Sequence, residues 1–537
     1  MTTRNTIIRH RFGGGWATDF GPTAEVDATE GGLVSVPWLN EAVNVDFLLD
    51  GGVRKAPGTQ KLNAAELASG AAIRGLFDYW RLGTLGSPAQ KRVLHVGTVL
   101  MKDDADGNFT NIATGLQLDA VPCYELFDDD LIIMSDAAAD VPRVYDQSTV
   151  ATLGTNTPLG AFGVTHKNRF WMAGVDSDPS GVYYSMAYPD GPQGDWNDAS
   201  AGVIRVDPGD GDRVTGLVSH KNELWVFKGP HKGSIHRIAG SSPTGSDAFS
   251  RNVFVRGTGS VNHNSIFKFQ DDVGFLWSDG SFRSLNATAA FGDFREASLS
   301  LAINTYLRDR VNYDALRFAW AKTLTSRGVV VITLPTDTST NNNVMLFMDF
   351  RFIPVEGQPR WSRHEHVEAA CLEVVIDATN NDRPTLFTGG NDGFVRRMGR
   401  SNRSVDETTS YEAKIELPYL HYGLPMQMKT LENAAIGVSP RGAYDITLGY
   451  TMDNHARQTA TVAQGGGDVL APAPANQFTL GTSQLGGARF TDLFFNLESA
   501  GEFRSIQFDA SQAGLDEDME VHTITAEISR GALSLEN

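Results

Sequence analysis

Cysteine is scarce in this chain, whose 537 residues include only Cys123 and Cys371. Neither belongs to a CxxC pair, so the sequence lacks that zinc or redox motif and the disulfide framework of small secreted scaffolds. Long apolar runs are also missing, since no stretch approaches the roughly 18 residues of a membrane-spanning helix. Because residues 1–16 contain no continuous apolar segment, we expect no signal peptide and synthesis in a cytoplasm.

An excess of basic residues is absent as well. Lys and Arg number 45 against 64 Asp and Glu, which gives a net charge of −19 at pH 7. Proteins that grip phosphate backbones present basic patches, so this composition argues against that class. An acidic wall would still suit a channel through which nucleic acid slides without sticking, and an ordinary acidic surface is equally compatible with the same charge.

Signatures of catalysis are also missing. The sequence contains neither a GxSxG nucleophile elbow nor a Walker A motif, and the glycine-rich stretch at 13–21 lacks the Lys-Ser/Thr of a P-loop. A propeller hydrolase would need a carboxylate pair, but 64 acidic residues allow many pairs and single out none. We therefore predict a protein that is not an enzyme.

Two segments are similar in part to metal sites. In the Asp-rich segment 102–107, Lys102 occupies the first ligand position of a calcium loop, and Ala113 stands where the bidentate acid is required. His364 and His366 would point the same way from one strand, but no third zinc ligand can be placed beside them. We interpret the two histidines as an exposed polar face, and we predict no metal and no cofactor.

What the chain does contain is glycine, at 55 residues, and many short apolar runs. The runs are of strand length, are rich in Val, Ile, Phe and Trp, and are separated by Gly, Asp and Asn turns, which is typical of an all-β fold. Helical periodicity is confined to a few segments, chiefly 293–310. Examples of the strand-like runs are RVLHVG (92–97), DLIIMS (130–135), VGFLWS (273–278), GVVVIT (328–333) and VMLFMD (344–349).

One internal repeat is clear. The segments VTHKNRFWMAG (164–174) and VSHKNELWVFKG (218–229) share a strand end, a polar turn and a strand that carries Trp. A propeller blade takes about 40–50 residues, and the apolar clusters recur at similar intervals. This pattern predicts an irregular β-propeller of six to eight blades over residues 41–405, with a helical insertion near 293–310. A large β-sandwich assembly is the alternative.

The two ends of the chain differ from this middle region. Residues 1–40 are glycine-rich and predict an extended N-terminal arm with little regular structure of its own. Residues 406–537 contain longer alternating stretches, as at 411–420 and 520–531, which predict a C-terminal β-sandwich.

Several segments carry a family resemblance, and their order along one chain is its strongest element. The segments are NVDFLLDGGVRKAPGTQ (44–60), HKNRFWMAGVDSDPSGVYYSMAYPDGPQGDW (166–196), DRVTGLVSHKNELWVFKGPHKGSIHRIAG (212–240), FLWSDGSFRSL (275–285) and LFTGGNDGFVRRM (386–398). In this order they resemble the tail nozzle proteins (tail tubular protein B) of short-tailed phages, together with related packaged-DNA stabilisation proteins. Two departures from that family are Ala56, where a second basic residue is commoner, and the insertion GPHKG at 229–233.

The resemblance implies a structural component of the virion tail. Six subunits would form a nozzle ring below an adaptor ring, and the ring's channel would retain the packaged genome and conduct it during ejection. The implied partners are further copies of the chain, adaptor or head-to-tail connector proteins, tail fibre or spike proteins, and genomic DNA in transient contact. A soluble β-propeller binding module for protein or glycan ligands is the alternative, followed by a propeller hydrolase.

One basic loop is a candidate for DNA contact. Lys228, His231 and Lys232 lie in or beside the inserted GPHKG, from where they would reach phosphates in a channel. The alternative is an exposed connection between strands with solvated lysines. A further set of arginines is expected to pair with acids on neighbouring blades or subunits: Arg251, Arg256, Arg396, Arg397 and Arg400.

Overall fold

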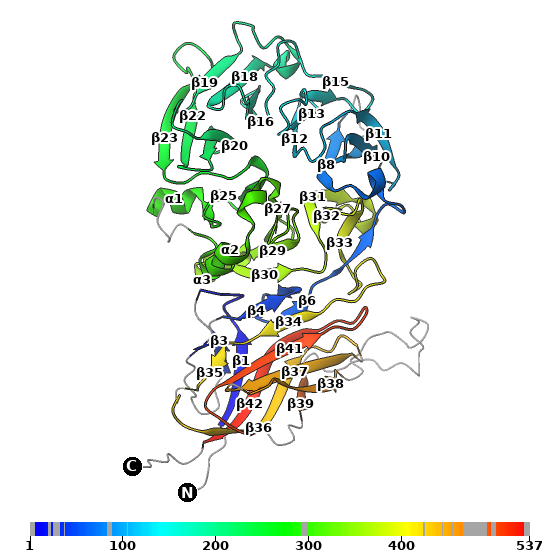
Figure 1. Ribbon diagram of the computed structural model, residues 1–537, viewed down its shortest axis with the longest axis vertical. Helices are drawn as coiled ribbons and strands as arrows, with labels where there is room; N and C mark the ends of the chain where they lie inside the picture. The colour runs from blue at the N-terminus through cyan, green and yellow to red at the C-terminus, as the bar shows by residue number, and fades with distance from the viewer. Residues whose placement is uncertain are drawn as a thin grey trace.

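The computed structural model divides the chain into a β-propeller and a β-sandwich that lie end to end (Figure 1). The fold is all-β, as predicted. Among the described residues, no helix is long and apolar enough to cross a membrane. The structure describes residues 6–19, 23–24, 33–36, 38–82, 89–104, 106–291, 298–422, 425–442, 444–453, 455–464, 491–495 and 501–530.

The propeller consists of six four-stranded blades and one three-stranded sheet, which lies within the predicted range of six to eight. The first two blades are β8 (Ile73–Arg81), β9 (Ala89–Val96), β10 (Val99–Asp103) and β11 (Phe109–Thr114), then β12 (Pro122–Phe127), β13 (Asp130–Ser135), β14 (Arg143–Tyr145) and β15 (Val150–Thr152). The next two are β16 (Phe162–His166), β17 (Arg169–Ala173), β18 (Gly181–Ala187) and β19 (Gly202–Arg205), then β20 (Arg213–His220), β21 (Glu223–Gly229), β22 (Ser234–Ala239) and β23 (Ser250–Arg256).

The three-stranded sheet follows, with β24 (Ile266–Phe269), β25 (Asp272–Leu276) and β26 (Phe282–Ser284). The fifth blade is β27 (Trp320–Leu324), β28 (Val329–Leu334), β29 (Val344–Asp349) and β30 (Arg360–His364). Short helices connect these strands: α1 (Leu285–Phe291), α2 (Asn304–Arg310) and α3 (Ile353–Glu356), with 3-10 turns at Leu67–Gly70, Gly191–Gln193, His263–Ser265, Leu301–Ile303, Tyr313–Phe318, Phe350–Phe352 and Ala378–Asn380.

The sixth four-stranded blade closes the ring with strands from both ends of the propeller sequence. It combines β31 (Ala369–Asp377), β32 (Arg383–Gly390) and β33 (Val395–Arg400) with β7 (Gly58–Lys61), which pairs antiparallel with β33. Gly58 lies close to the chain around Ser404, because a Cβ placed there would come within 2.2 Å of the Ser404 carbonyl oxygen. The ring therefore closes only after a strand from the N-terminal part of the chain adds to its last blade.

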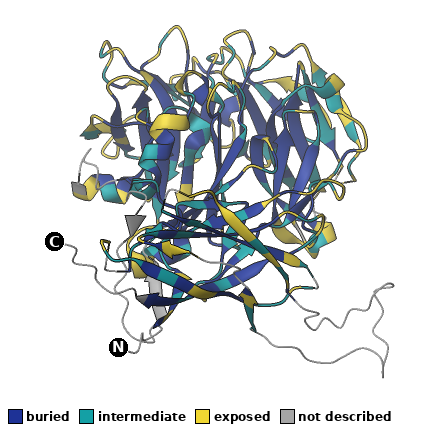
Figure 2. Ribbon diagram, turned by 60° about the horizontal axis from the view of Figure 1, so that its bottom comes forward, coloured by how far each residue is buried: buried dark blue, intermediate teal, exposed yellow. Residues whose placement is uncertain are grey.

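The sequence repeat marks equivalent hairpins of neighbouring blades. Lys167 and Asn168, like Lys221 and Asn222, have positive φ angles of 47–64° and form the two-residue turns of the β16–β17 and β20–β21 hairpins. The indole N–H groups of the following tryptophans donate to the carbonyl before each turn, at 3.2 Å from Trp171 and 3.3 Å from Trp225. The blade interiors are buried and the turns are exposed (Figure 2).

The sandwich has two facing sheets. One contains β3 (Leu33–Val36), β1 (Thr6–Phe12), β42 (Glu520–Arg530), β36 (Lys429–Val438) and β39 (Thr491–Phe495), with β40 (Glu502–Phe503), β5 (Val45–Phe47) and β6 (Val53–Lys55). The other contains β2 (Thr23–Ala24), β35 (Tyr419–Leu420), β41 (Ile506–Gln512), β34 (Ala413–Glu416), β4 (Glu41–Val43), β37 (Asp445–Met452) and β38 (Gln458–Ala463).

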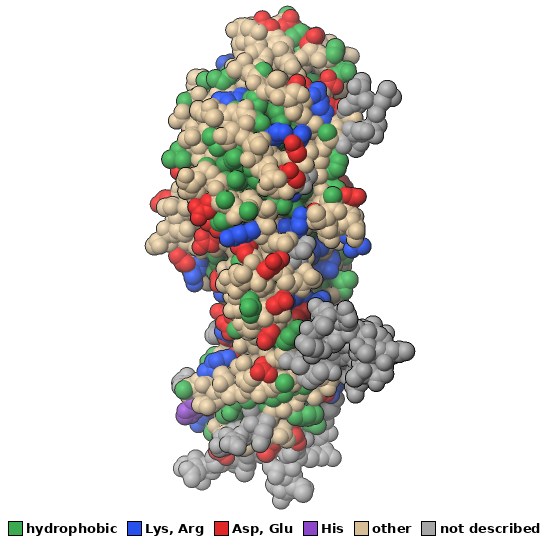
Figure 3. Space-filling model, turned by 90° about the vertical axis from the view of Figure 1, so that its right-hand side faces the viewer, with side chains coloured by type: hydrophobic (Ala, Val, Ile, Leu, Met, Phe, Trp, Pro, Cys, Tyr) green, Lys and Arg blue, Asp and Glu red, His purple; other side chains and the backbone are tan. Residues whose placement is uncertain are grey.

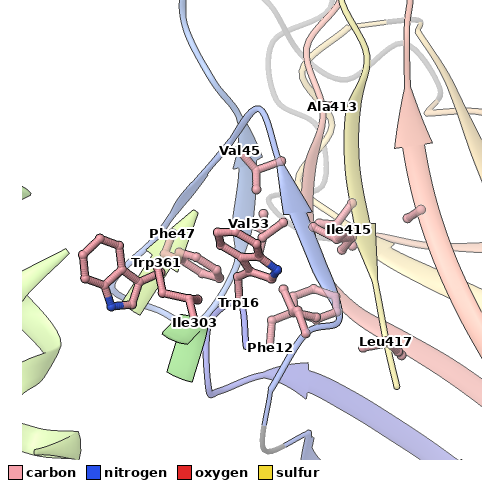
Figure 4. Close-up of a cluster of buried hydrophobic side chains, with 14 of the residues drawn as sticks. Phe12, Trp16, Val45, Phe47, Val53, Ile303, Trp361, Ala413, Ile415 and Leu417 are labelled. Atoms are coloured by element: carbon pink, nitrogen blue, oxygen red, sulfur yellow. The ribbon is translucent and has the colours of Figure 1, made fainter. Parts of the chain in front are cut away.

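One strand connects the two lobes by hydrogen bonds. β4 pairs antiparallel with β34 of the sandwich, and Val43 forms a parallel bridge with Arg363 of the fifth blade. Apolar side chains from both lobes fill the space around this strand (Figure 4), including Trp16 and Trp361, which are 2% and 0% exposed. The sandwich and the fifth blade thus share one hydrophobic core.

The predicted N-terminal arm and domain boundary need correction. Residues Thr6–Phe12 form β1, which pairs antiparallel with β42, and its alternate residues Ile8, His10 and Phe12 are fully buried in the sandwich. β4, β5 and β6 also lie in sandwich sheets, so the propeller strands start at β7 and not at residue 41. The reason is that apolar residues alternate in these short segments, which lets them complete sheets begun by the C-terminal region.

The helical insertion predicted near 293–310 is shorter than expected. Residues 292–297 lie outside the described part, Ser298 forms an isolated bridge with Arg283, and the α-helix covers only Asn304–Arg310. Its buried residues are Tyr306 and Leu307, which join the core shared by the two lobes.

The close approach of Gly58 to the chain around Ser404, where the ring closes, can be tested by substitution. We expect Gly58→Ala to lower the free energy of unfolding by about 1–3 kcal/mol, because the new methyl group would meet backbone that has to move. Gly501→Ala is the matched control, since a Cβ there meets nothing within 4 Å. Urea unfolding followed by tryptophan fluorescence measures both, and equal midpoints for the two variants would contradict the tight closure.

Acid sensitivity of the sandwich is a second prediction. Burial lowers the pKa of His10 from 6.5 to about 4, and its Nε2 lies 3.2 Å from the Tyr422 hydroxyl. Between pH 6.5 and 4 the unfolded chain binds this proton and the folded chain does not. The contribution of neutral His10 to the free energy of unfolding is therefore complete above pH 6.5, and up to about 3 kcal/mol of it is lost as the pH drops to 4. The slope of stability against pH should be shallower in His10→Gln but unchanged in His455→Gln, whose histidine is exposed.

Candidate functional site

The predicted DNA-contact loop is the β21–β22 connection, and the structure contradicts the role of Lys228. This side chain is 0% exposed, and its Nζ donates to the carbonyl oxygens of Val206 and Asp207 at 2.8 and 3.0 Å and to Asp210 Oδ1 at 2.8 Å. A buried ammonium needs such partners because it has lost its water. Lys228 therefore anchors the connection between two blades and cannot reach a phosphate.

The other two loop residues are exposed. The backbone N–H groups of His231, Lys232 and Gly233 all donate to the carboxylate of Asp212, at 2.7–2.9 Å. These three hydrogen bonds hold the loop backbone in one conformation. The side chains of His231 and Lys232 remain at the surface. Of the three predicted contact residues, only these two are exposed, and the Lys232 Nζ also donates to the Asp210 carbonyl at 2.8 Å.

The four predicted arginines whose side chains are described do pair with acids, but these acids belong to the same blade or to the loop that leads into it, and not to a neighbouring blade as expected. Arg251 and Arg256 both pair with Asp207. The other two pairs lie in the closing blade, where Arg396 meets Asp392 at 2.6 Å and Arg397 meets Asp377 at 2.7 Å. The side chain of Arg400 is outside the described part. These pairs stabilise turns within the propeller.

Two cavities lie where the first strands of the blades converge on the propeller axis. They have volumes of about 330 and 360 Å³, and both are lined by Cys123, His263 and Asn264, so we treat them as one axial site. β12, β16 and β20 contribute to both cavities, and β27 contributes to the larger. Cavities of this size hold small ligands.

The larger axial cavity is lined by an ion pair whose glutamate is buried and whose lysine is partly exposed. Lys322 Nζ lies 2.8 Å from Glu373 Oε2, and Glu125 accepts a hydrogen bond of 3.0 Å from the backbone N–H of Thr165. Burial raises the pKa of both glutamates. Phe77 and Trp320 form apolar parts of the same wall. The cavity thus offers carboxylates, an ammonium and aromatic surface to a ligand.

The smaller axial cavity is bordered by two acid–base pairs. Asp176 and Arg213 meet at 2.6 Å, and Asp136 and Arg317 at 3.8 Å. Between the cavities, His263 stacks on Phe162 with ring centroids 4.9 Å apart and accepts a hydrogen bond at Nδ1 from the N–H of Leu217. Burial lowers the pKa of His263 to about 4, so its imidazole is neutral at pH 7.

No sequence motif indicated the axial site. Its residues come from the first strands of the blades, from the 3-10 turn at His263–Ser265 and from connections between strands, so they belong to segments that are tens of residues apart in the chain. The one available signal was the repeat itself, because residues at equivalent positions of successive blades meet at the axis.

The two segments tested as metal sites are structural in the fold. In the Asp-rich turn, Asp103 is 0% exposed, accepts N–H bonds from Asp106 and Gly107, and meets Arg92 at 2.5 Å. His364 is buried and its Nε2 donates to the Val45 carbonyl at 3.1 Å, so the expectation that it forms part of an exposed polar face is wrong. Among the described residues, no cluster of three or more His, Cys, Asp or Glu could hold a metal ion.

Comparison with known proteins gives information about the fold and about nothing else. In sequence, no protein-family profile and no curated protein matches the chain. Among solved structures, YCF48 bound to a D1 peptide is 11% identical, with a TM-score of 0.37 over 64% of this chain and 98% of that one. A gluconolactonase from Xanthomonas campestris is 12% identical, with a TM-score of 0.32 over 67% of this chain and 97% of that one.

An exo-β-1,3-galactanase from Phanerochaete chrysosporium shows the same distant likeness, at 9% identity and a TM-score of 0.24 over 88% of this chain and 99% of that one. Similarity at this level carries no argument about ligand or activity, so function has to be argued from the sites of this chain.

The anchoring role of Lys228 leads to a direct test. We expect Lys228→Met to lower the free energy of unfolding by about 3 kcal/mol, because it leaves two buried carbonyl groups without a donor and Asp210 without its partner. Lys232→Met, at an exposed position four residues away, should change stability by less than about 0.5 kcal/mol. Unfolding of both variants by guanidinium measures these free energies. A loss at Lys228→Met no larger than that at Lys232→Met would contradict the anchoring role of Lys228.

Proposed function

We propose that this chain is a non-enzymatic structural subunit of a phage tail, a member of a nozzle ring through which the genome is retained and later ejected. The observation that carries this proposal is the order of the nozzle-like segments along the chain. Residues 44–60 cross from the sandwich into the propeller and include the ring-closing β7, and residues 166–196 and 212–240 belong to successive blades. The resemblance therefore falls on structural features of the fold.

The union of the two lobes suits a part that carries load. β4 joins the sandwich to the fifth blade by hydrogen bonds, and the tryptophans beside it are buried in the shared core. β1 and β42 place both ends of the described chain side by side in the sandwich (Figure 1). Under this proposal the sandwich contacts the adjoining ring, and force passes into the propeller without a flexible linker.

The DNA channel of such a ring would lie between subunits. The axial cavities have the volume of a small-ligand site, so the propeller axis is not the passage for a duplex. The net charge of −19 would keep DNA from adhering to the wall. On the face shown in Figure 3, acidic and basic side chains are interspersed over the described residues, which fits a surface without a phosphate-gripping patch.

A soluble propeller that binds a ligand is the second candidate. The axial site favours it, because a cavity with aromatic wall, the Lys322–Glu373 pair and Glu125 has the make-up of a binding pocket. This reading predicts a monomer whose ligand protects the axial residues. Nozzle assembly predicts a ring whose formation leaves the axial residues unchanged.

Location in the particle is the first measurement. Immunogold electron microscopy of virus-like particles from the source culture, with an antibody raised against the purified chain, should place label on the tail below the neck. Sedimentation of the purified chain should show a ring-sized oligomer, and six subunits are expected. Bare particles in a culture whose soluble fraction holds the chain as a monomer would overturn the nozzle proposal and favour the binding module.

A further inference from the structure

A further cavity lies away from the propeller axis. It has a volume of about 510 Å³ and opens between the fifth blade and the closing blade, near the point where the chain enters β7. Pro57, directly before β7, lies on its wall together with residues of β27, β29, β30, β32 and β33. The cavity therefore lies at the seam between the fifth and closing blades, beside the start of the ring-closing strand β7, and its role is independent of the nozzle proposal.

The floor of this seam cavity is apolar. Leu324, Phe347, Leu386 and Met398 line it, and each is 3–5% exposed and belongs to the core that joins these two blades. The imidazole of His364 lies against Phe347 with ring centroids 3.8 Å apart. Burial lowers the pKa of His364 to about 4, so the ring is neutral at pH 7 and extends the apolar wall. Such a floor accepts a planar apolar group.

The rim is cationic. Arg327 is 37% exposed and pairs with Asp46 at 2.5 Å through Nη2. Arg383 is exposed, and no acidic group among the described residues lies within 4.0 Å of its guanidinium. The carboxylate of Asp377, the cross-strand neighbour of Arg383, is already held by Arg397.

The charges around the cavity therefore do not cancel. Arg327, Arg383 and Asp46 sum to one positive charge, in a chain whose net charge is −19. In contrast, Arg396 and Arg397 on the neighbouring strand β33 each have an acidic partner. An unpaired guanidinium at the mouth of an apolar cavity is the arrangement that binds a carboxylate through two parallel N–H bonds.

We propose that the seam cavity binds a small amphipathic organic acid, with a planar apolar body on the floor and a carboxylate at Arg383, supported by Arg327. The volume falls within the usual 300–1,000 Å³ range of small-molecule sites. Because the ligand would touch both blades at the seam, binding would stabilise the closed ring in proportion to its occupancy.

The test uses 2-naphthylacetate as the probe and 2-naphthylacetamide as its neutral match. Saturation-transfer NMR and thermal unfolding of the full chain measure binding and stabilisation. The acid should bind saturably at millimolar concentration or below and raise the unfolding temperature, and the amide should bind at least about tenfold more weakly, because it forms no charge-assisted bond with Arg383. No saturable binding of the acid, or equal binding of acid and amide, overturns the proposal.

Two variants locate the site. Arg383→Gln should weaken the acid about tenfold or more and leave the amide unchanged, whereas Arg205→Gln, an exposed arginine on β19 of another blade, should change neither. Ser326→Trp places a bulky side chain at the exposed mouth and should abolish binding of both probes while the fold is kept. Unaltered binding in Arg383→Gln, or in a folded Ser326→Trp, would assign the probe to another place.

Discussion

The core between the fifth blade and the sandwich is the interaction on which the rest of the structure depends. Trp361 of β30 is fully buried, its carbonyl accepts the N–H of Trp16 at 3.1 Å, and its indole donates to the Leu299 carbonyl at 3.2 Å. Large aromatic side chains bury more apolar area than any others, so these two residues fix the position of each lobe against the other. The N-terminal segment that carries Trp16 therefore holds the two lobes together.

The connections between blades are held differently, by buried charged groups in place of apolar contacts. Lys228 is held by two carbonyl groups and Asp210, and Asp212 holds three successive N–H groups of the next loop. Buried charges of this kind are costly unless every bond is made, so they give the loops one conformation. A loop that looks basic in sequence is therefore partly a structural joint.

The two cavity systems differ in what they offer a ligand. The axial site is nearly balanced in charge, because Lys322 meets Glu373 and both arginines of the smaller cavity have acidic partners. The seam cavity has an apolar floor and an unpaired arginine at its rim. This difference in electrostatics, more than the difference in volume, makes the seam the better place for an anion.

The sequence by itself determined the strand-rich class, the propeller with its terminal sandwich, and the paired hairpins of the HKN repeat, because these depend on local alternation and on turn residues that tolerate positive φ. Only the tertiary structure decided that Thr6–Phe12 belongs to the sandwich, that β7 closes the ring, and that Lys228 is buried. Each of these depends on contacts between segments far apart in the chain. The local sequence pattern predicts the strand to which a residue belongs but not the partner that buries it. For the same reason neither the axial site nor the seam cavity could be predicted from the sequence.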